Sequence, residues 1–102
     1  MTQLLIVYTL IVVKYEWDDA KNRLNIRKHG IDFTDVPSMF QHPMVTFFDS
    51  RKDYGEDRWI GIGILKTLLA VVVFTELTAD TTRIISARKE TTHEERIYRN
   101  EI

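Results

Sequence analysis

The chain has 102 residues, of which 44% are apolar and 28% charged, and this composition predicts one globular domain rather than a disordered segment. It contains no cysteine, which excludes disulfides, thiolate metal sites and a cysteine nucleophile. The formal charge of −1 and a pI near 6.3 argue against a general electrostatic grip on nucleic acid, so any such contact has to be local.

The first thirteen residues differ in composition from the rest of the chain. Residues 4–13 are apolar apart from Tyr8 and Thr9. This run is too short to span a bilayer, and neither a basic n-region nor a small-residue cleavage site marks it as a signal peptide. Its β-branched residues would also suit an added edge strand. We expect residues 1–13 to be an upstream extension and residues 14–102 to form the domain.

Two helices are expected after a short strand at residues 14–17. Asp18 or Asp19 is suited to cap the first helix, and Gly30 is typical of the left-handed residue that ends one. The second helix follows Asp32, which is its expected N-cap. Its predicted inner face consists of Phe33, Val36, Pro37 and Phe40.

Strand patterns occupy the second half of the chain. Residues 45–48, 58–65 and 68–75 are rich in β-branched and apolar residues, and short turns separate the last two of these runs. A fourth run starts at Arg83. Because short turns join consecutive strands into antiparallel pairs, we predict an α+β fold with an antiparallel sheet, in the order β-α-α-β-β-β-β-α, and helices on one face.

The fourth run leads into a C-terminal helix. Side chains alternate along a strand, so Ile85 and Ala87 are expected to face one way, and Ile84, Ser86 and Arg88 the other. Thr92 and Glu95 have the spacing of a capping box, which predicts a helix that begins near His93.

The residues exclude several kinds of chemistry. His29, His42 and His93 have no partner at metal-ligand spacing, and the chain has neither a phosphate-binding glycine loop nor a glycine-flanked serine. What remains is a set of cations near strand ends and loops. These are Arg51, Lys52, Arg58, Arg83 and Arg88.

Arginine is suited to hold a phosphodiester, because its fork binds two phosphate oxygens and its charge persists at every relevant pH. Arg58 and Arg88 stand out because each lies at a strand boundary. His29 and Glu56 are the residues suited to accept a proton. Both residues also have a structural interpretation. His29 is a cation at a helix end, and Glu56 is the ion-pair partner of Arg58. Tyr98 is suited either to stack on a base or to pack on the core.

Four motifs, in this order, resemble the BrnT family of type II toxin–antitoxin toxins. The resemblance extends from Lys14 to about Tyr98. Pro37 departs from it, since an alanine is expected there. The motifs are Tyr15-Glu16-Trp17-Asp18; Lys28-His29-Gly30-Ile31 with Phe33; Tyr54-Gly55-Glu56-Asp57-Arg58; and Arg83-Ile84-Ile85-Ser86-Ala87-Arg88 with Glu95-Arg96-Ile97-Tyr98.

The resemblance implies a RelE-like fold and a cytoplasmic ribonuclease that cleaves RNA by 2′-hydroxyl attack without a metal or other cofactor. It also implies a BrnA-like antitoxin as partner, contact with operator DNA only through that complex, and no membrane association. Carried onto this sequence, it implies His29 or Glu56 as base and Arg58 and Arg88 on the phosphate. The RNA-binding residues expected around them are Lys28, Arg51, Arg83, Ser86 and Tyr98.

A non-catalytic function is the alternative. The acidic pI and the absence of an unambiguous base also suit an antitoxin-binding co-repressor module whose basic face docks an acidic segment of its partner.

Overall fold

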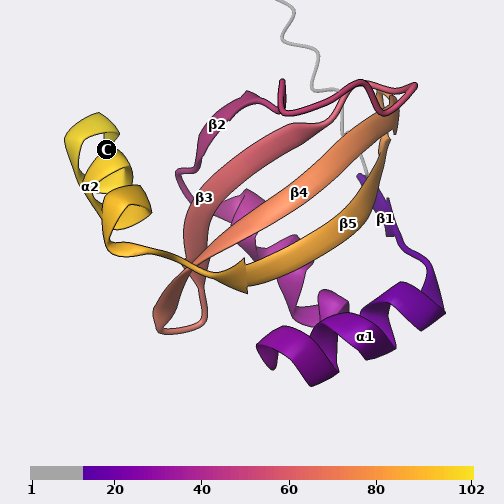
Figure 1. Cartoon of the computed structure of the whole chain (residues 1–102), viewed down its shortest axis with the longest axis horizontal. Helices are drawn as coiled ribbons and strands as arrows, with labels where there is room; N and C mark the ends of the chain where they lie inside the picture. Colours follow the sequence, from indigo (N-terminus) through magenta and orange to yellow (C-terminus); the bar gives the residue numbers. More distant parts are fainter. Residues whose placement is uncertain (1–12) are drawn as a thin grey trace, which may run out of the picture.

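The computed structural model describes residues 13–102 and has the predicted order of elements, with a 3-10 helix as its second helix (Figure 1). Most of the expected upstream extension, residues 1–12, lies outside the described residues. No helix within residues 13–102 is long and apolar enough to cross a membrane. The elements are β1 Lys14–Glu16, α1 Asp19–His29, η1 Phe33–Gln41, β2 Val45–Phe48, β3 Trp59–Leu65, β4 Leu68–Thr78, β5 Thr81–Lys89 and α2 Thr92–Glu101.

The five strands form one sheet in the order β1-β5-β4-β3-β2. The pairs β2–β3, β3–β4 and β4–β5 are antiparallel, as predicted, and short turns join the last two pairs. β1 pairs parallel with β5, so the sheet is mixed rather than wholly antiparallel. A short turn between two strands forces them to pair antiparallel. No such turn joins β1 to β5, so the sequence does not indicate in which direction they pair.

The first helix has the predicted ends. Asp18 accepts a hydrogen bond from the Lys21 backbone N–H and caps α1, and Gly30 ends it in the left-handed conformation at φ 72°. The last turn of α1 therefore carries Lys28 and His29 to the end of the helix that lies beside β5.

The helix η1 covers one face of the sheet and contributes the centre of the core. Phe33 and Val36 point inward as predicted, but Met39 completes the buried row, while Pro37 and Phe40 are only half-buried. The reason is the helix type: a 3-10 helix has three residues per turn, so residues 33, 36 and 39 share one side.

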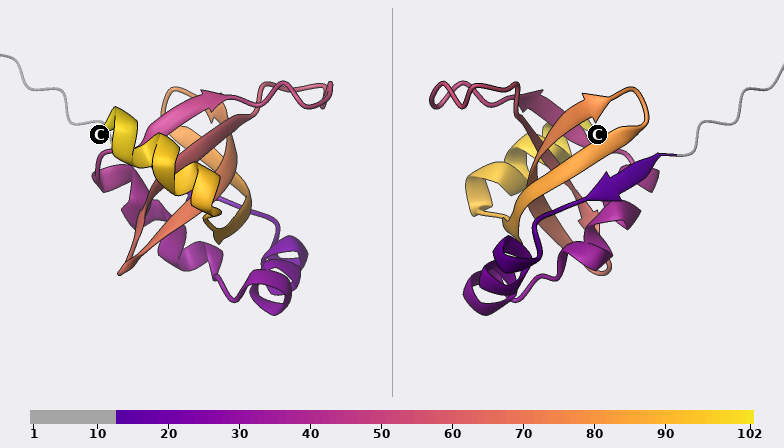
Figure 2. Two further views of the ribbon diagram at one scale, coloured as in Figure 1. Left: turned by 60° about the vertical axis from the view of Figure 1, so that its left-hand side comes forward. Right: turned by 90° about the vertical axis from the view of Figure 1, so that its right-hand side faces the viewer.

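The helix α2 lies against the other face, contrary to the expectation that all helices share one face (Figure 2). It contacts β2 and β3, and the Tyr98 hydroxyl donates a hydrogen bond of 3.3 Å to the Pro43 carbonyl. Its capping box is formed by Thr91 and Glu94, one residue before the predicted pair. Both pairs have the same spacing, and only the tertiary partners of the two glutamates distinguish them.

The alternation predicted for β5 is interrupted by a β-bulge. Ser86 pairs with Val73, whereas the next β4 residue, Phe74, pairs with Ile84, which leaves Ile85 as the extra residue. Ile84 and Ala87 therefore both enter the core, and the predicted pairing of Ile85 with Ala87 on one face is wrong. Ser86 and Arg88 lie on the face opposite Ala87, as predicted.

Candidate active site

The sheet face opposite η1 carries Ser86 and Arg88 of β5. Ser86 pairs with Val73 and Arg88 with Val71, two buried residues on the same side of β4. A separation of two residues places Ser86 and Arg88 about 7 Å apart along the strand. The loop after β2 carries Arg51, whose partner Asp49 donates its backbone N–H to the Arg58 carbonyl over 2.8 Å.

Two further arginines lie toward the other end of this face. Arg83 pairs with Thr75, and Arg58 precedes Trp59, whose partner Phe74 is adjacent to Thr75. Arg58 and Arg83 therefore flank Thr75 from the two neighbouring strands. With two strand spacings and four residues between them, the backbones of Arg58 and Arg88 lie roughly 16 Å apart. We refer to Arg51, Arg58, Arg83, Arg88 and Ser86 together as the arginine face.

Arg88 is fixed by two charge-assisted hydrogen bonds to Glu94. Its Nη1 and Nη2 atoms lie 2.8 and 2.6 Å from the two Glu94 carboxylate oxygens. The side chain of Arg88 is 38% exposed and that of Glu94 only 14%. Hydrogen bonds from Arg88 lower the pKa of Glu94 to about 2, and the same pair raises the pKa of Arg88.

Arg51 is held by a carboxylate that is itself buried. Its Nε and Nη2 atoms each lie 2.8 Å from an oxygen of Asp49, whose side chain is fully buried. The Arg51 side-chain hydrogen bonds lower the pKa of Asp49 to about 2 despite its burial. Asp49 thus anchors the start of the loop between β2 and β3, which extends beyond the sheet (Figure 2).

The two remaining arginines are also paired. Arg58 donates to Glu56 over 3.2 Å and lies 4.1 Å from the centre of the Tyr54 ring, a cation–π contact. Arg83 lies 2.9 Å from Glu16 of β1, with both side chains about half exposed. Each arginine of the arginine face therefore has one carboxylate partner, which agrees with the near-zero net charge of the chain.

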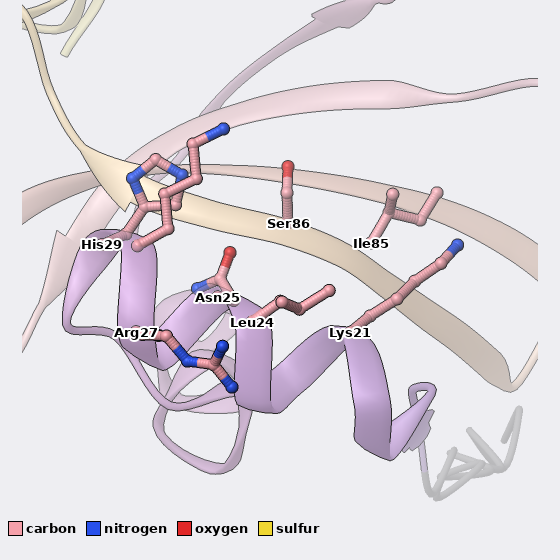
Figure 3. A pocket seen from close by; sticks show the side chains of 8 residues that line it. Lys21, Leu24, Asn25, Arg27, His29, Ile85 and Ser86 are labelled. Atoms are coloured by element: carbon pink, nitrogen blue, oxygen red, sulfur yellow. The ribbon is translucent and has the colours of Figure 1, made fainter.

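A cavity of about 500 Å³ adjoins the arginine face at Ser86 (Figure 3). Its ionisable side chains are all basic, and they come from α1, whereas Ile85 and Ser86 of β5 form its opposite wall. In Figure 3 the His29 ring and the Ser86 hydroxyl lie on the same side of the α1 ribbon. The lining residues are Lys21, Leu24, Asn25, Arg27, Lys28, His29, Ile85 and Ser86.

Asn25 fixes α1 against the free edge of β5. Its side-chain NH₂ donates to the carbonyls of Ile31 and Ala87, each over 2.9 Å, and its oxygen accepts from the Ala87 N–H over 3.1 Å. The amide thereby replaces a neighbouring strand at this edge, where β1 has already ended. This buried contact sets Lys28 and His29 beside Ser86.

The structure brings some of the predicted site residues together and separates others. Lys28 and His29 line one cavity with Ser86, and Arg88 lies two residues farther along β5. Glu56 lies instead at the far end beside Arg58, where it has the ion-pair role considered for it. Tyr98 binds Pro43 through its hydroxyl and holds α2 in place.

The two carboxylates with lowered pKa values predict acid sensitivity. In the folded chain the pKa of Asp49 is lowered from 3.8 to about 2, and the pKa of Glu94 from 4.5 to about 2. They therefore stabilise the fold fully above about pH 4.5, and this contribution, on the order of 2 kcal/mol each, is lost as the pH falls toward 2. Urea unfolding between pH 7 and pH 2 should show this loss. Asp49→Asn should flatten the pH dependence, and an unchanged slope in that variant would contradict the assignment.

The family model described as "Ribonuclease toxin, BrnT, of type II toxin-antitoxin system" matches residues 17–94, well over half of the chain. The chain belongs to the BrnT family. The predicted resemblance is thus confirmed, and with it a ribonuclease toxin of a type II toxin–antitoxin system. The matched range includes every predicted site residue except Tyr98.

A solved structure agrees with this assignment. The chain is similar to the 1.1 Angstrom-resolution crystal structure of the Brucella abortus ribonuclease toxin, BrnT, at 28% sequence identity and a TM-score of 0.65. The match covers 79% of this chain and 100% of that chain. This similarity confirms the α+β fold, while the narrower RelE-like arrangement stays a prediction. No curated protein matches the chain.

Three residues of the candidate site were not predicted from the sequence. Asp49 directly follows the strand pattern of residues 45–48, so its position at a strand end was a usable signal. Tyr54 belongs to the quoted Tyr-Gly-Glu-Asp-Arg motif. Glu94 had no separate signal, because the neighbouring Glu95 fits the capping box equally well. Within residues 13–102, no group of three or more histidine and acidic side chains is placed to hold a metal ion.

Proposed function

We propose that this BrnT-family chain cleaves RNA without a metal ion, by attack of a ribose 2′-oxygen on the adjacent phosphorus. The observation that supports this most is the position of Ser86 and Arg88 on one face of β5, with Lys28 and His29 lining the cavity at Ser86. Fixed guanidinium groups stabilise the negative charge that develops on the phosphorane, which is the largest demand of this reaction.

The reaction needs one proton acceptor and one proton donor. The 2′-hydroxyl gives its proton to the base, the 2′-oxygen bonds to phosphorus, and the bond from phosphorus to the 5′-oxygen of the next nucleotide breaks. That oxygen takes up a proton. The products carry a 2′,3′-cyclic phosphate and a 5′-hydroxyl, and no water or oxidant is consumed.

We assign the base to His29 rather than to Glu56. Glu56 accepts a hydrogen bond from Arg58 at the end of the face remote from Arg88. His29 lines the cavity next to Ser86, and no described side chain forms an ion pair with it. Histidine is the side chain that most often serves as a general base in enzymes. In this assignment Arg88 binds the scissile phosphate, with Arg51 and Lys28 as supporting cations and Arg58 and Arg83 on flanking phosphates.

The partner proposed for the chain is a BrnA-like antitoxin that neutralises it, with operator DNA contacted only through that complex. The family description supports an antitoxin in general terms, since it names a toxin–antitoxin system.

RNA cleavage in excess EDTA tests the proposed mechanism. The purified chain should cleave at an unchanged rate with chelator and leave 2′,3′-cyclic phosphate ends, which phosphatase treatment and mass spectrometry can identify. Loss of cleavage in EDTA and its recovery with Mg²⁺ would overturn metal independence. Folded protein without any cleavage would favour the antitoxin-binding co-repressor.

A further inference from the structure

The hydrogen bonds of Arg88 leave a particular part of its guanidinium group unused. An arginine has five N–H donors. Nη1 of Arg88 uses both of its donors, on Glu94 and on the Lys89 carbonyl at 3.2 Å, and Nη2 uses one donor on Glu94. The Nε–H and the second Nη2–H have no partner among the described residues. These two donors point the same way and form one complete fork.

Hydrogen bonds with Thr91 hold Glu94 in the position from which it binds Arg88. One of its oxygens, Oε1, also accepts the Thr91 backbone N–H over 2.8 Å, and the Thr91 hydroxyl accepts the Glu94 backbone N–H over 3.3 Å. Glu94 is therefore shared between the capping box of α2 and the guanidinium of β5. Arg51 differs, because its Nε and Nη2 fork is already occupied by Asp49.

We infer that Glu94 is a positioning residue for RNA cleavage, which turns the Nε and Nη2 edge of Arg88 toward the scissile phosphate. The inference rests on the role proposed above for Arg88. The Glu94 carboxylate binds the edge formed by Nη1 and Nη2 and leaves the edge formed by Nε and Nη2 free. A phosphate can accept two parallel hydrogen bonds from that free edge. Glu94, at the start of α2, by this inference belongs to the site and acts through Arg88.

The variant Glu94→Gln separates the two roles of this residue. Glutamine is as suitable as glutamate in a capping box, so α2 should keep its start. Its amide offers Arg88 one acceptor instead of two and adds donors that oppose the guanidinium. We expect kcat for an unstructured RNA oligonucleotide to fall tenfold to a hundredfold with KM changed by less than about threefold, the loss typical of a misplaced group.

The matched control is Glu95→Gln, the same change at the neighbouring glutamate, which pairs with Arg99 and leaves the contact between Arg88 and Glu94 in place. It should leave kcat unchanged. Equal losses of kcat in the two variants, in proportion to stability, would overturn the positioning role, and so would a Glu94→Gln variant with full activity.

The combination with Arg88→Lys distinguishes this inference from the proposed function. If Glu94 acts through Arg88, adding Glu94→Gln to Arg88→Lys should lower kcat no further. A further tenfold loss would show that Glu94 acts by another route and would overturn the inference alone. If the variants Arg88→Lys and Arg88→Ala each cleave RNA at the wild-type rate, the proposed role of Arg88 is overturned instead.

Discussion

Replacing Arg88 by alanine should reduce RNA cleavage at least about a hundredfold, which is the cost of losing one main stabiliser of transition-state charge. Arg88 lies on the arginine face two residues from Ser86, and Glu94 binds its Nη1 and Nη2 atoms. The measurement is the rate of cleavage of an RNA oligonucleotide, together with binding of the antitoxin, which should survive.

The alanine variant also leaves Glu94 without its partner, so a loss of stability has to be separated from a loss of chemistry. Arg88→Lys keeps a positive charge near Glu94 but provides no two-pronged donor. It should therefore remain folded and still cleave poorly. Arg99→Ala is the matched control, because Arg99 is an exposed arginine that pairs only with Glu95 on α2. Full activity in both Arg88 variants would move the site elsewhere, and loss of antitoxin binding without any wild-type cleavage would favour the co-repressor function.

Replacing Asn25 by alanine should lower the free energy of unfolding by about 3 kcal/mol, a large fraction of the stability of a domain of this size. The change removes three hydrogen bonds and leaves the Ala87 N–H and C=O and the Ile31 C=O without their side-chain partner. Urea unfolding followed by tryptophan fluorescence measures the effect.

Two further variants test the reason for this loss. Asn25→Asp keeps the shape and the acceptor for the Ala87 N–H but removes the donors, so it should also destabilise the fold. Arg23→Ala, on the exposed side of the same helix, should change the free energy of unfolding by no more than about 0.5 kcal/mol. If Asn25→Ala unfolds at the same urea concentration as Arg23→Ala, the amide does not secure α1 to β5.

Much of the local structure followed from local chemistry. Asp18 and Gly30 predicted the ends of α1, because an N-cap acceptor and a left-handed glycine act on their own helix. The strand runs after residue 44 predicted antiparallel pairing, and short turns enforce it between β3 and β4 and between β4 and β5. The choice of Arg88 and Ser86 as residues opposite Ala87 was correct for the same reason, since alternation over two residues is local.

The failures in strand alternation, strand direction and the placement of α2 involved partners distant in sequence. The bulge at Ile85 reversed the alternation between Ile84 and Ala87, and a bulge is set by the neighbouring strand β4. The direction of β1 depended on its pairing with β5. The position of α2 depended on which face of the sheet was left uncovered.

The sequence by itself determined the family, the order of elements and the set of cations available for phosphate, because motifs, caps and residue types are properties of short segments. Only the tertiary structure decided how these cations are used. It paired Arg83 with Glu16, separated Glu56 from Arg88, and brought His29 beside Ser86 through the buried amide of Asn25. The physical reason is that the contacts of Asn25 with Ala87 and of Arg83 with Glu16 join residues 62 and 67 positions apart, a distance over which no sequence pattern specifies a partner.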